Sequence, residues 1–133
     1  MATNGNAPHI HVLNSSQTFL QLMHDLLSDE GFRVTTDDKA DEKIEDIIKL
    51  APDLIILDFL WINDDSGWRL LQILKLDPRT SPIPVILCTA GVQEAEALLP
   101  QLQKLDISVV YKPFNIEQLL NVVYQRLPRI EPV

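Results

Sequence analysis

Short runs of hydrophobic residues alternate along the chain with longer segments in which hydrophobic residues recur at helical spacing. The short runs predict strands at 10–13, 32–36, 54–57, 85–88 and 107–111. The longer segments predict helices at 16–30, 37–50, 67–76, 92–105 and 116–127. Pro100 stands inside the segment 92–105, where it would kink that helix or restart it as a first-turn residue.

This order of elements indicates the fold class. Strands that alternate with helices are typical of a parallel sheet with helices on both faces. The runs at 54–57 and 85–88 are hydrophobic throughout, as expected of strands buried on both sides. We therefore expect one α/β domain, a doubly wound five-stranded parallel sheet over residues 9–127. Residues 1–8 would form a disordered N-terminal tail and residues 128–133 a C-terminal tail.

Composition narrows the range of functions. The chain has 133 residues, of which 46% are hydrophobic and 23% charged, enough to bury a core. Its net charge of −8 argues against direct nucleic-acid binding. Cys88 is the single cysteine, which excludes a disulfide framework and a cysteine zinc site and suits a reducing cytoplasm. We expect no signal peptide and no membrane-spanning helix.

Polar side chains follow three of the predicted strands directly. Asp58 ends the third strand, Thr89 the fourth and Lys112 the fifth. In open parallel sheets ligands bind at the carboxyl ends of the strands. A carboxylate, a hydroxyl and an ammonium group at that edge suit the transfer of a phosphoryl group onto the carboxylate. Each residue alone is more commonly a solvated end, a cap or a turn; their joint placement favours a site.

Four stretches then carry a resemblance to a known family. They are "PDLIILD", "SGW", "DPRTSPIPVILCTA" and "YKPF". In this order and spacing the chain resembles a bacterial response regulator receiver domain of the CheY-like superfamily, over about residues 9–127. The resemblance implies a (βα)5 flavodoxin-like fold with strand order 2-1-3-4-5.

The resemblance also implies roles and partners. Asp58 would accept a phosphoryl group from a sensor histidine kinase or phosphotransfer protein, and Thr89 and Lys112 would bind the phosphoryl oxygens. Mg²⁺ would be held by Asp58, the backbone carbonyl of Leu60 and the residues after the first strand. The protein would be a cytoplasmic phosphoacceptor of two-component signalling, not an enzyme in the usual sense. It would act through protein contacts, with a possible homodimer through the fourth helix, fifth strand and fifth helix.

The sequence departs from the family pattern in two places. Asn14 and Ser15 stand where receivers have an acidic pair, so we expect weakened Mg²⁺ binding. Asp64 and Asp65 could compensate, although a solvated turn is the commoner explanation. Val109 stands three residues before Lys112, where the family often has an aromatic residue, so the usual aromatic switch is not expected.

Two alternatives remain open at this stage. The first is a degenerate receiver that keeps the fold and acts as a protein-interaction module without phosphorylation. The second is an enzyme of similar fold, but a haloacid-dehalogenase-type phosphatase would need an acid two residues after Asp58, where Leu60 stands. A thioredoxin-like protein would need C-x-x-C, which the chain lacks.

Three histidines complete the candidates. His9 and His11 flank the first strand at i, i+2 and could share a face, but a third metal ligand is not identifiable. We expect these two to be ordinary surface or edge histidines and His24, on the first helix, to be solvated.

Overall fold

A five-stranded parallel sheet forms the centre of the protein. The computed structural model describes residues 7–38, 44–58, 66–112 and 115–127. The strands run in the order β2-β1-β3-β4-β5, with bounds β1 (His9–Asn14), β2 (Arg33–Asp37), β3 (Leu54–Asp58), β4 (Val85–Thr89) and β5 (Ile107–Tyr111). This confirms the predicted fold and strand order. Most of both expected tails, residues 1–6 and 128–133, lies outside the described residues.

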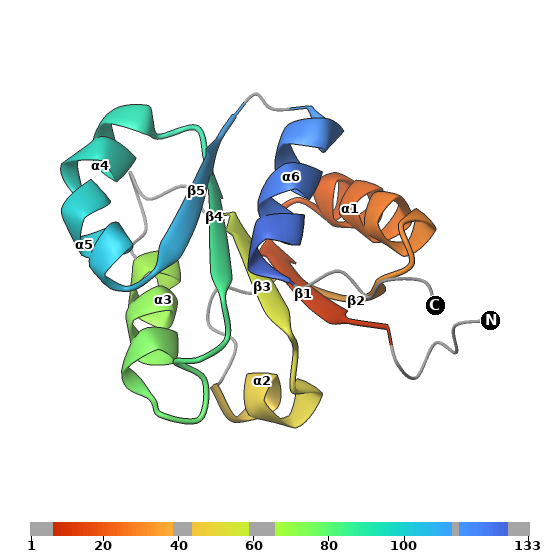
Figure 1. Ribbon diagram of the computed structural model, residues 1–133, viewed down its shortest axis with the longest axis horizontal. Helices are drawn as coiled ribbons and strands as arrows, with labels where there is room; N and C mark the ends of the chain where they lie inside the picture. The colour runs from red at the N-terminus through yellow and green to blue at the C-terminus, as the bar shows by residue number, and fades with distance from the viewer. Residues whose placement is uncertain (1–6, 39–43, 59–65, 113–114, 128–133) are drawn as a thin grey trace.

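Helices cover both faces of the sheet (Figure 1). Their bounds are α1 (Gln17–Asp29), α2 (Ile44–Leu50), α3 (Ser66–Leu76), α4 (Val92–Ala97), α5 (Leu99–Lys104) and α6 (Ile116–Arg126). One core cluster joins α1 and α6 to alternate strand residues such as Val12, Ile56 and Cys88. The other joins α3 and α5 to the intervening residues such as Leu13, Leu57 and Leu87. The alternation of a strand's side chains thus accounts for both layers.

Local signals set the ends of helix α1. The Ser16 hydroxyl caps its start by accepting a hydrogen bond from the backbone N–H of Phe19 at 3.3 Å. After the last turn, Gly31 adopts a φ of +94°, a conformation that glycine reaches without steric cost. The capping serine and the glycine after the last turn therefore mark the two ends of this helix.

Two helix predictions need correction. The segment predicted as one helix over 92–105 forms two short helices that meet at Leu98, and Pro100 lies in the first turn of α5. Proline lacks an N–H and suits the first turn of a helix, so the second of the two possibilities for Pro100 is confirmed. The helix predicted over 37–50 is wrong at its start, because Asp37 still belongs to β2 and pairs with Leu13. At Asp37 the pairing of β2 with β1 determines the structure, and the helical spacing of the sequence does not.

The prediction for His9 and His11 is also wrong. Both lie in β1, every residue of which is buried, and they are only 6% and 1% exposed. Thr35 on the neighbouring strand β2 makes this burial possible, because its hydroxyl lies within hydrogen-bond distance of both rings. His24 has a side chain 48% exposed, as predicted. Across the described segments, no three His, Cys, Asp or Glu side chains gather into a set that could hold a metal ion.

None of the helices within the described ranges is both long enough and apolar enough to cross a bilayer.

Candidate functional site

The register of the sheet brings the predicted site residues to one edge. Asn14 and Asp58 are Cα partners at the carboxyl ends of β1 and β3. Thr89 and Tyr111 are Cα partners at the ends of β4 and β5, and Lys112 follows immediately. The backbone placement predicted for Asp58, Thr89 and Lys112 is therefore found. Leu60, Asp64 and Asp65 lie outside the described residues.

Thr89 is held by two backbone groups. The Gly91 N–H donates to Oγ1 of Thr89 at 2.9 Å, and the Lys112 N–H donates to the Thr89 carbonyl oxygen at 2.9 Å. The Thr89 side chain is almost fully buried. Because Oγ1 already accepts a hydrogen bond, its own hydroxyl proton remains the group that it can offer to an anion. The second hydrogen bond fixes where the Lys112 backbone leaves the sheet.

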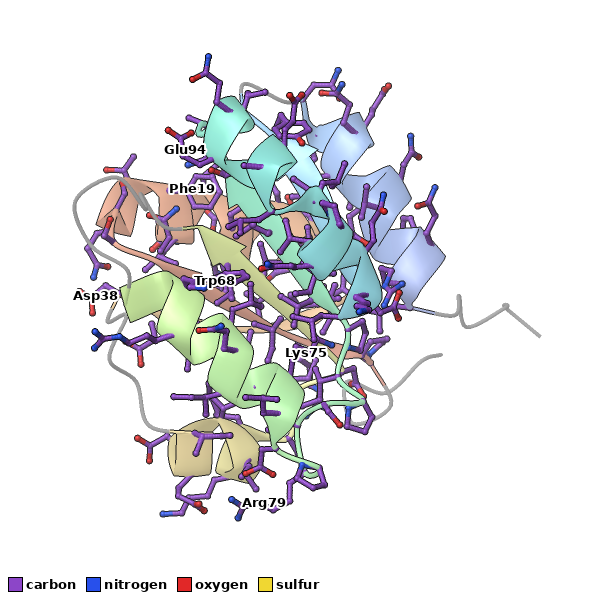
Figure 2. All side chains as sticks on the ribbon, turned by 90° about the vertical axis from the view of Figure 1, so that its left-hand side faces the viewer. Phe19, Asp38, Trp68, Lys75, Arg79 and Glu94 are labelled. Atoms are coloured by element: carbon purple, nitrogen blue, oxygen red, sulfur yellow. The ribbon has the colours of Figure 1, made fainter. Side chains whose placement is uncertain are left out.

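The turn after β4 brings the Glu94 carboxylate close to the backbone of Gly91. A Cβ atom at Gly91 would lie 2.8 Å from Oε2 of Glu94 and 3.4 Å from Oγ1 of Thr89. A side chain at position 91 would therefore displace the Glu94 carboxylate from the turn. Glu94 and Phe19 lie toward the same end of the molecule (Figure 2). Sequence reasoning missed Glu94, whose proximity arises only from the shape of this turn.

The Lys112 ammonium lies against an aromatic ring. Its Nζ is 5.0 Å from the ring centroid of Phe19 on α1, within the range of a cation–π interaction. Phe19 is partly buried and packs against the core cluster that joins α1 and α6. Sequence reasoning assigned Phe19 only to the apolar stripe of the first helix, because no local pattern links it to a residue after the last strand.

An apolar groove begins beside this contact. It has a volume of about 480 Å³ and is lined by Phe19, Leu22, Met23, Leu26, Ala90, Lys112 and Ile116. Leu22, from the outer side of α1, is 53% exposed. The groove therefore joins an apolar surface to the cationic end of the site.

The described residues do not fit the Mg²⁺ site of the family. Asn14 is 4% exposed, and its Oδ1 accepts the backbone N–H of Ser16 at 2.7 Å. That oxygen is neutral and already engaged at the start of α1, while Ser15 is exposed and offers only a hydroxyl. A hard divalent cation prefers anionic oxygen ligands. The expected weakness of metal binding thus has a structural basis in the role of Asn14.

The chain is similar to several signalling proteins of known sequence. It is 33% identical over 125 residues to the phosphate regulon transcriptional regulatory protein PhoB of Rhizobium meliloti, covering 94% of this chain and 54% of that protein. To PhoB of Escherichia coli it is 25% identical over 127 residues, covering 96% of this chain and 55% of that protein. The chain thus spans about half the length of these curated relatives.

Solved structures show the same arrangement. The signal receiver domain of a signal transduction histidine kinase from Syntrophus aciditrophicus superposes with a TM-score of 0.77 at 25% identity, covering 96% of this chain and 97% of that chain. The chemotaxis response regulator CheY4 of Vibrio cholerae gives a TM-score of 0.74 at 20% identity, over 92% of this chain and 100% of that one. The second likeness shows the fold alone.

A family model provides the assignment. The response regulator receiver domain matches residues 10–124, which include the ends of all five strands and the three predicted site residues. The chain therefore belongs to the response regulator receiver domain family and takes part in two-component signalling.

Proposed function

We propose that Asp58 accepts a phosphoryl group and that Thr89 and Lys112 bind the oxygens of that group. A carboxylate oxygen of Asp58 would attack phosphorus, a P–O bond would form, and the P–N bond to a donor histidine would break. The electron pair of that bond would stay on the imidazole. The observation that carries this proposal is the sheet register, which sets Asp58 at the same edge as Thr89 and Lys112.

The polar groups at this edge suit a phosphoryl group. The Thr89 hydroxyl has its proton available, because Oγ1 accepts the Gly91 N–H. Lys112 supplies a positive charge, and the hydrogen bond from its N–H to Thr89 keeps the two residues adjacent. Hydrogen bonds from charged donors to phosphoryl oxygens are stronger than those between neutral groups. An unphosphorylated interaction module would need neither group at this edge.

We propose that phosphotransfer to Asp58 depends only weakly on Mg²⁺. Asn14 is engaged at the start of α1, and Ser15 carries no charge. Lys112 would then have to neutralise a larger share of the negative charge of the phosphoryl group.

The phosphodonor would be a sensor histidine kinase or a phosphotransfer protein that docks in the groove beside Lys112. Any protein that delivers a phosphohistidine to Asp58 has to approach this edge. The groove is continuous with the site, since Lys112 and Ala90 belong to both. Its remaining wall is apolar and comes mainly from α1, which suits the apolar face of a partner helix. A cytoplasmic location follows from such a partner and agrees with Cys88, a buried cysteine outside any disulfide.

A homodimer through α4, α5, β5 and α6 is a further proposal, for which the apolar residues offer little support. Leu102 is fully buried, and Leu98 and Leu105 pack partly against the core. Polar contacts would therefore have to supply much of such an interface. Light scattering at high concentration, with and without beryllofluoride, tests it: a monomer in both conditions would exclude the dimer.

Phosphorylation of Asp58 is tested by incubation with acetyl phosphate or phosphoramidate, followed by intact mass. We expect a phosphoryl adduct on the wild type and none on Asp58→Ala, with Asp53→Ala as a carboxylate control before the same strand. The adduct should form with and without added Mg²⁺. A wild type that takes no adduct, while Ser15→Asp does, would favour the phosphorylation-independent module instead. An adduct that persists in Asp58→Ala would place the acceptor elsewhere.

A further inference from the structure

The Lys112 ammonium contacts the ring of Phe19, which is held in place by packing. Its Nζ lies 5.0 Å from the ring centroid of Phe19. Phe19 packs against the core, and its backbone N–H is bonded to the Ser16 cap in the first turn of α1. Lysine, by contrast, has a flexible four-carbon stem that can take many conformations. In this contact the ring therefore determines where the ammonium lies.

The strand order shows in which direction the Lys112 side chain extends to reach Phe19. Lys112 follows β5, an edge strand, whereas Phe19 belongs to the helix that follows β1. Between β1 and β5 lie β3 and β4, so the two ends are about 14 Å apart at normal strand spacing. A lysine stem that reaches a ring on α1 is turned away from the open edge of the sheet and back toward β3. Asp58 ends β3.

An aromatic ring is suited to orienting a lysine that also binds an anion. A carboxylate partner would neutralise the ammonium and compete with an incoming anion. An aromatic face attracts the cation through its quadrupole and leaves the formal charge in place. The contact with the ring therefore removes none of the positive charge that Lys112 brings to a phosphoryl group.

We propose that Phe19 is a positioning residue for phosphorylation, whose ring holds the Lys112 ammonium toward the carboxyl end of β3. This inference rests on the proposed role of Asp58. A cation–π contact at a partly exposed site contributes about 0.5–1 kcal/mol, which corresponds to a factor of about two to five in an equilibrium constant. Loss of the ring should weaken the binding of a phosphoryl mimic by that factor.

The experiment measures the apparent dissociation constant of beryllofluoride by calorimetry, and the rate of adduct formation with acetyl phosphate. Phe19→Leu, which keeps an apolar side chain without a ring, should bind beryllofluoride about two- to fivefold more weakly. Phe19→Tyr, which keeps the ring, should match the wild type. Gln21→Ala is the matched control, because Gln21 is exposed on the same helix and its side chain donates to Asp25. It should leave both quantities unchanged.

A double-mutant cycle tests whether the effect passes through Lys112. In a Lys112→Met background, Phe19→Leu should cause no further loss. By NMR, the Lys112 Hε protons should show an upfield ring-current shift in the wild type and in Phe19→Tyr, and lose it in Phe19→Leu. If Phe19→Leu does not fold, Phe19→Met provides the same comparison.

The outcomes separate the two proposals. A wild type that binds beryllofluoride, together with a Phe19→Leu variant of equal affinity, overturns the role of Phe19 alone. An equal loss in the Lys112→Met background overturns it as well, because Phe19 would then act on stability and not on Lys112. A wild type that takes neither beryllofluoride nor a phosphoryl adduct overturns the role of Asp58, and the positioning role with it.

Discussion

His9 and His11 converge on a single oxygen atom inside the sheet. Nε2 of His9 lies 2.8 Å, and Nδ1 of His11 lies 2.6 Å, from the hydroxyl oxygen of Thr35. Nδ1 of His9 lies 3.2 Å from the Leu50 carbonyl, which can only accept, so this nitrogen carries the proton of a neutral ring. The Thr35 hydroxyl then donates to His9 and accepts from His11. The arrangement satisfies all these groups while both histidines are neutral.

We expect the protein to lose stability as the pH falls below neutrality. Burial lowers the pKa of His9 from its ordinary value of 6.5, and the nearby charge of Arg33 lowers it further. The Leu50 carbonyl and Asp53 act in the opposite direction, and His11 adds to the lowering. The unfolded chain therefore binds a proton before the folded one does. Stability is complete above about pH 6.5 and declines as the pH drops from there toward the lowered pKa.

Chemical denaturation between pH 7.5 and pH 5 checks this expectation. His9→Gln should flatten the decline, because it removes the group that titrates. His24→Gln is the control, since His24 is exposed and should leave the slope as it is. Equal slopes in the wild type and His9→Gln would mean that another group governs the pH dependence.

Thr35→Val should destabilise the protein by about 1–3 kcal/mol, because it leaves two buried imidazole nitrogens without their partner. Thr36→Val is the matched control: it makes the same chemical change one residue later, at an exposed position of the same strand. Urea unfolding at pH 7.5 gives both values. A similar loss in both variants would show that the threonines contribute through strand propensity and not through the histidines.

Ser15→Asp should make the binding of beryllofluoride depend on Mg²⁺ more strongly than it does in the wild type. The change adds an anionic oxygen at an exposed position, where it costs little stability. Titrations with beryllofluoride at several Mg²⁺ concentrations measure the dependence. Gln17→Glu, which adds the same charge two residues later, is the control and should show no such gain. Strong Mg²⁺ dependence in the wild type would refute the weak site.

Leu22→Arg should slow phosphotransfer from a partner protein and leave labelling by acetyl phosphate unchanged. Leu22 lines the groove but is 53% exposed, so the change places a charge on the docking surface with little effect on the core. Ile73→Arg is the control, since Ile73 is 48% exposed on α3, and none of the described side chains of α3 lines the groove. A slower reaction with acetyl phosphate as well would indicate damage to the site itself.

The sequence predicted the strands closely. The hydrophobic runs of β3 and β4 reflect burial on both faces of the sheet. The run at 107–111 matches β5 residue for residue. The common edge of the three candidate residues was predicted for a related reason: parallel strands bring their carboxyl ends to one edge, so that position along the chain gives position in space. Asp58, Thr89 and Lys112 needed no other information.

Contacts between elements that are distant in the sequence could not be predicted from position along the chain. The burial of His9 depends on Thr35, which lies in another strand. The cation–π contact of Lys112 depends on Phe19 of α1, a helix distant from Lys112 in the sequence. The Glu94 carboxylate lies where a side chain at position 91 would be, which depends on the absence of a side chain at Gly91. Each of these relationships is set by packing, for which the sequence carries no periodic signal.

The hydrogen bond from the Ser16 N–H to the Asn14 side chain has a consequence for how this family can vary. A carboxylate at position 14 would accept the same bond with the same geometry. An amide or an acid at position 14 can therefore keep this hydrogen bond at the start of α1, while the charge at the carboxyl end of β1 differs between them.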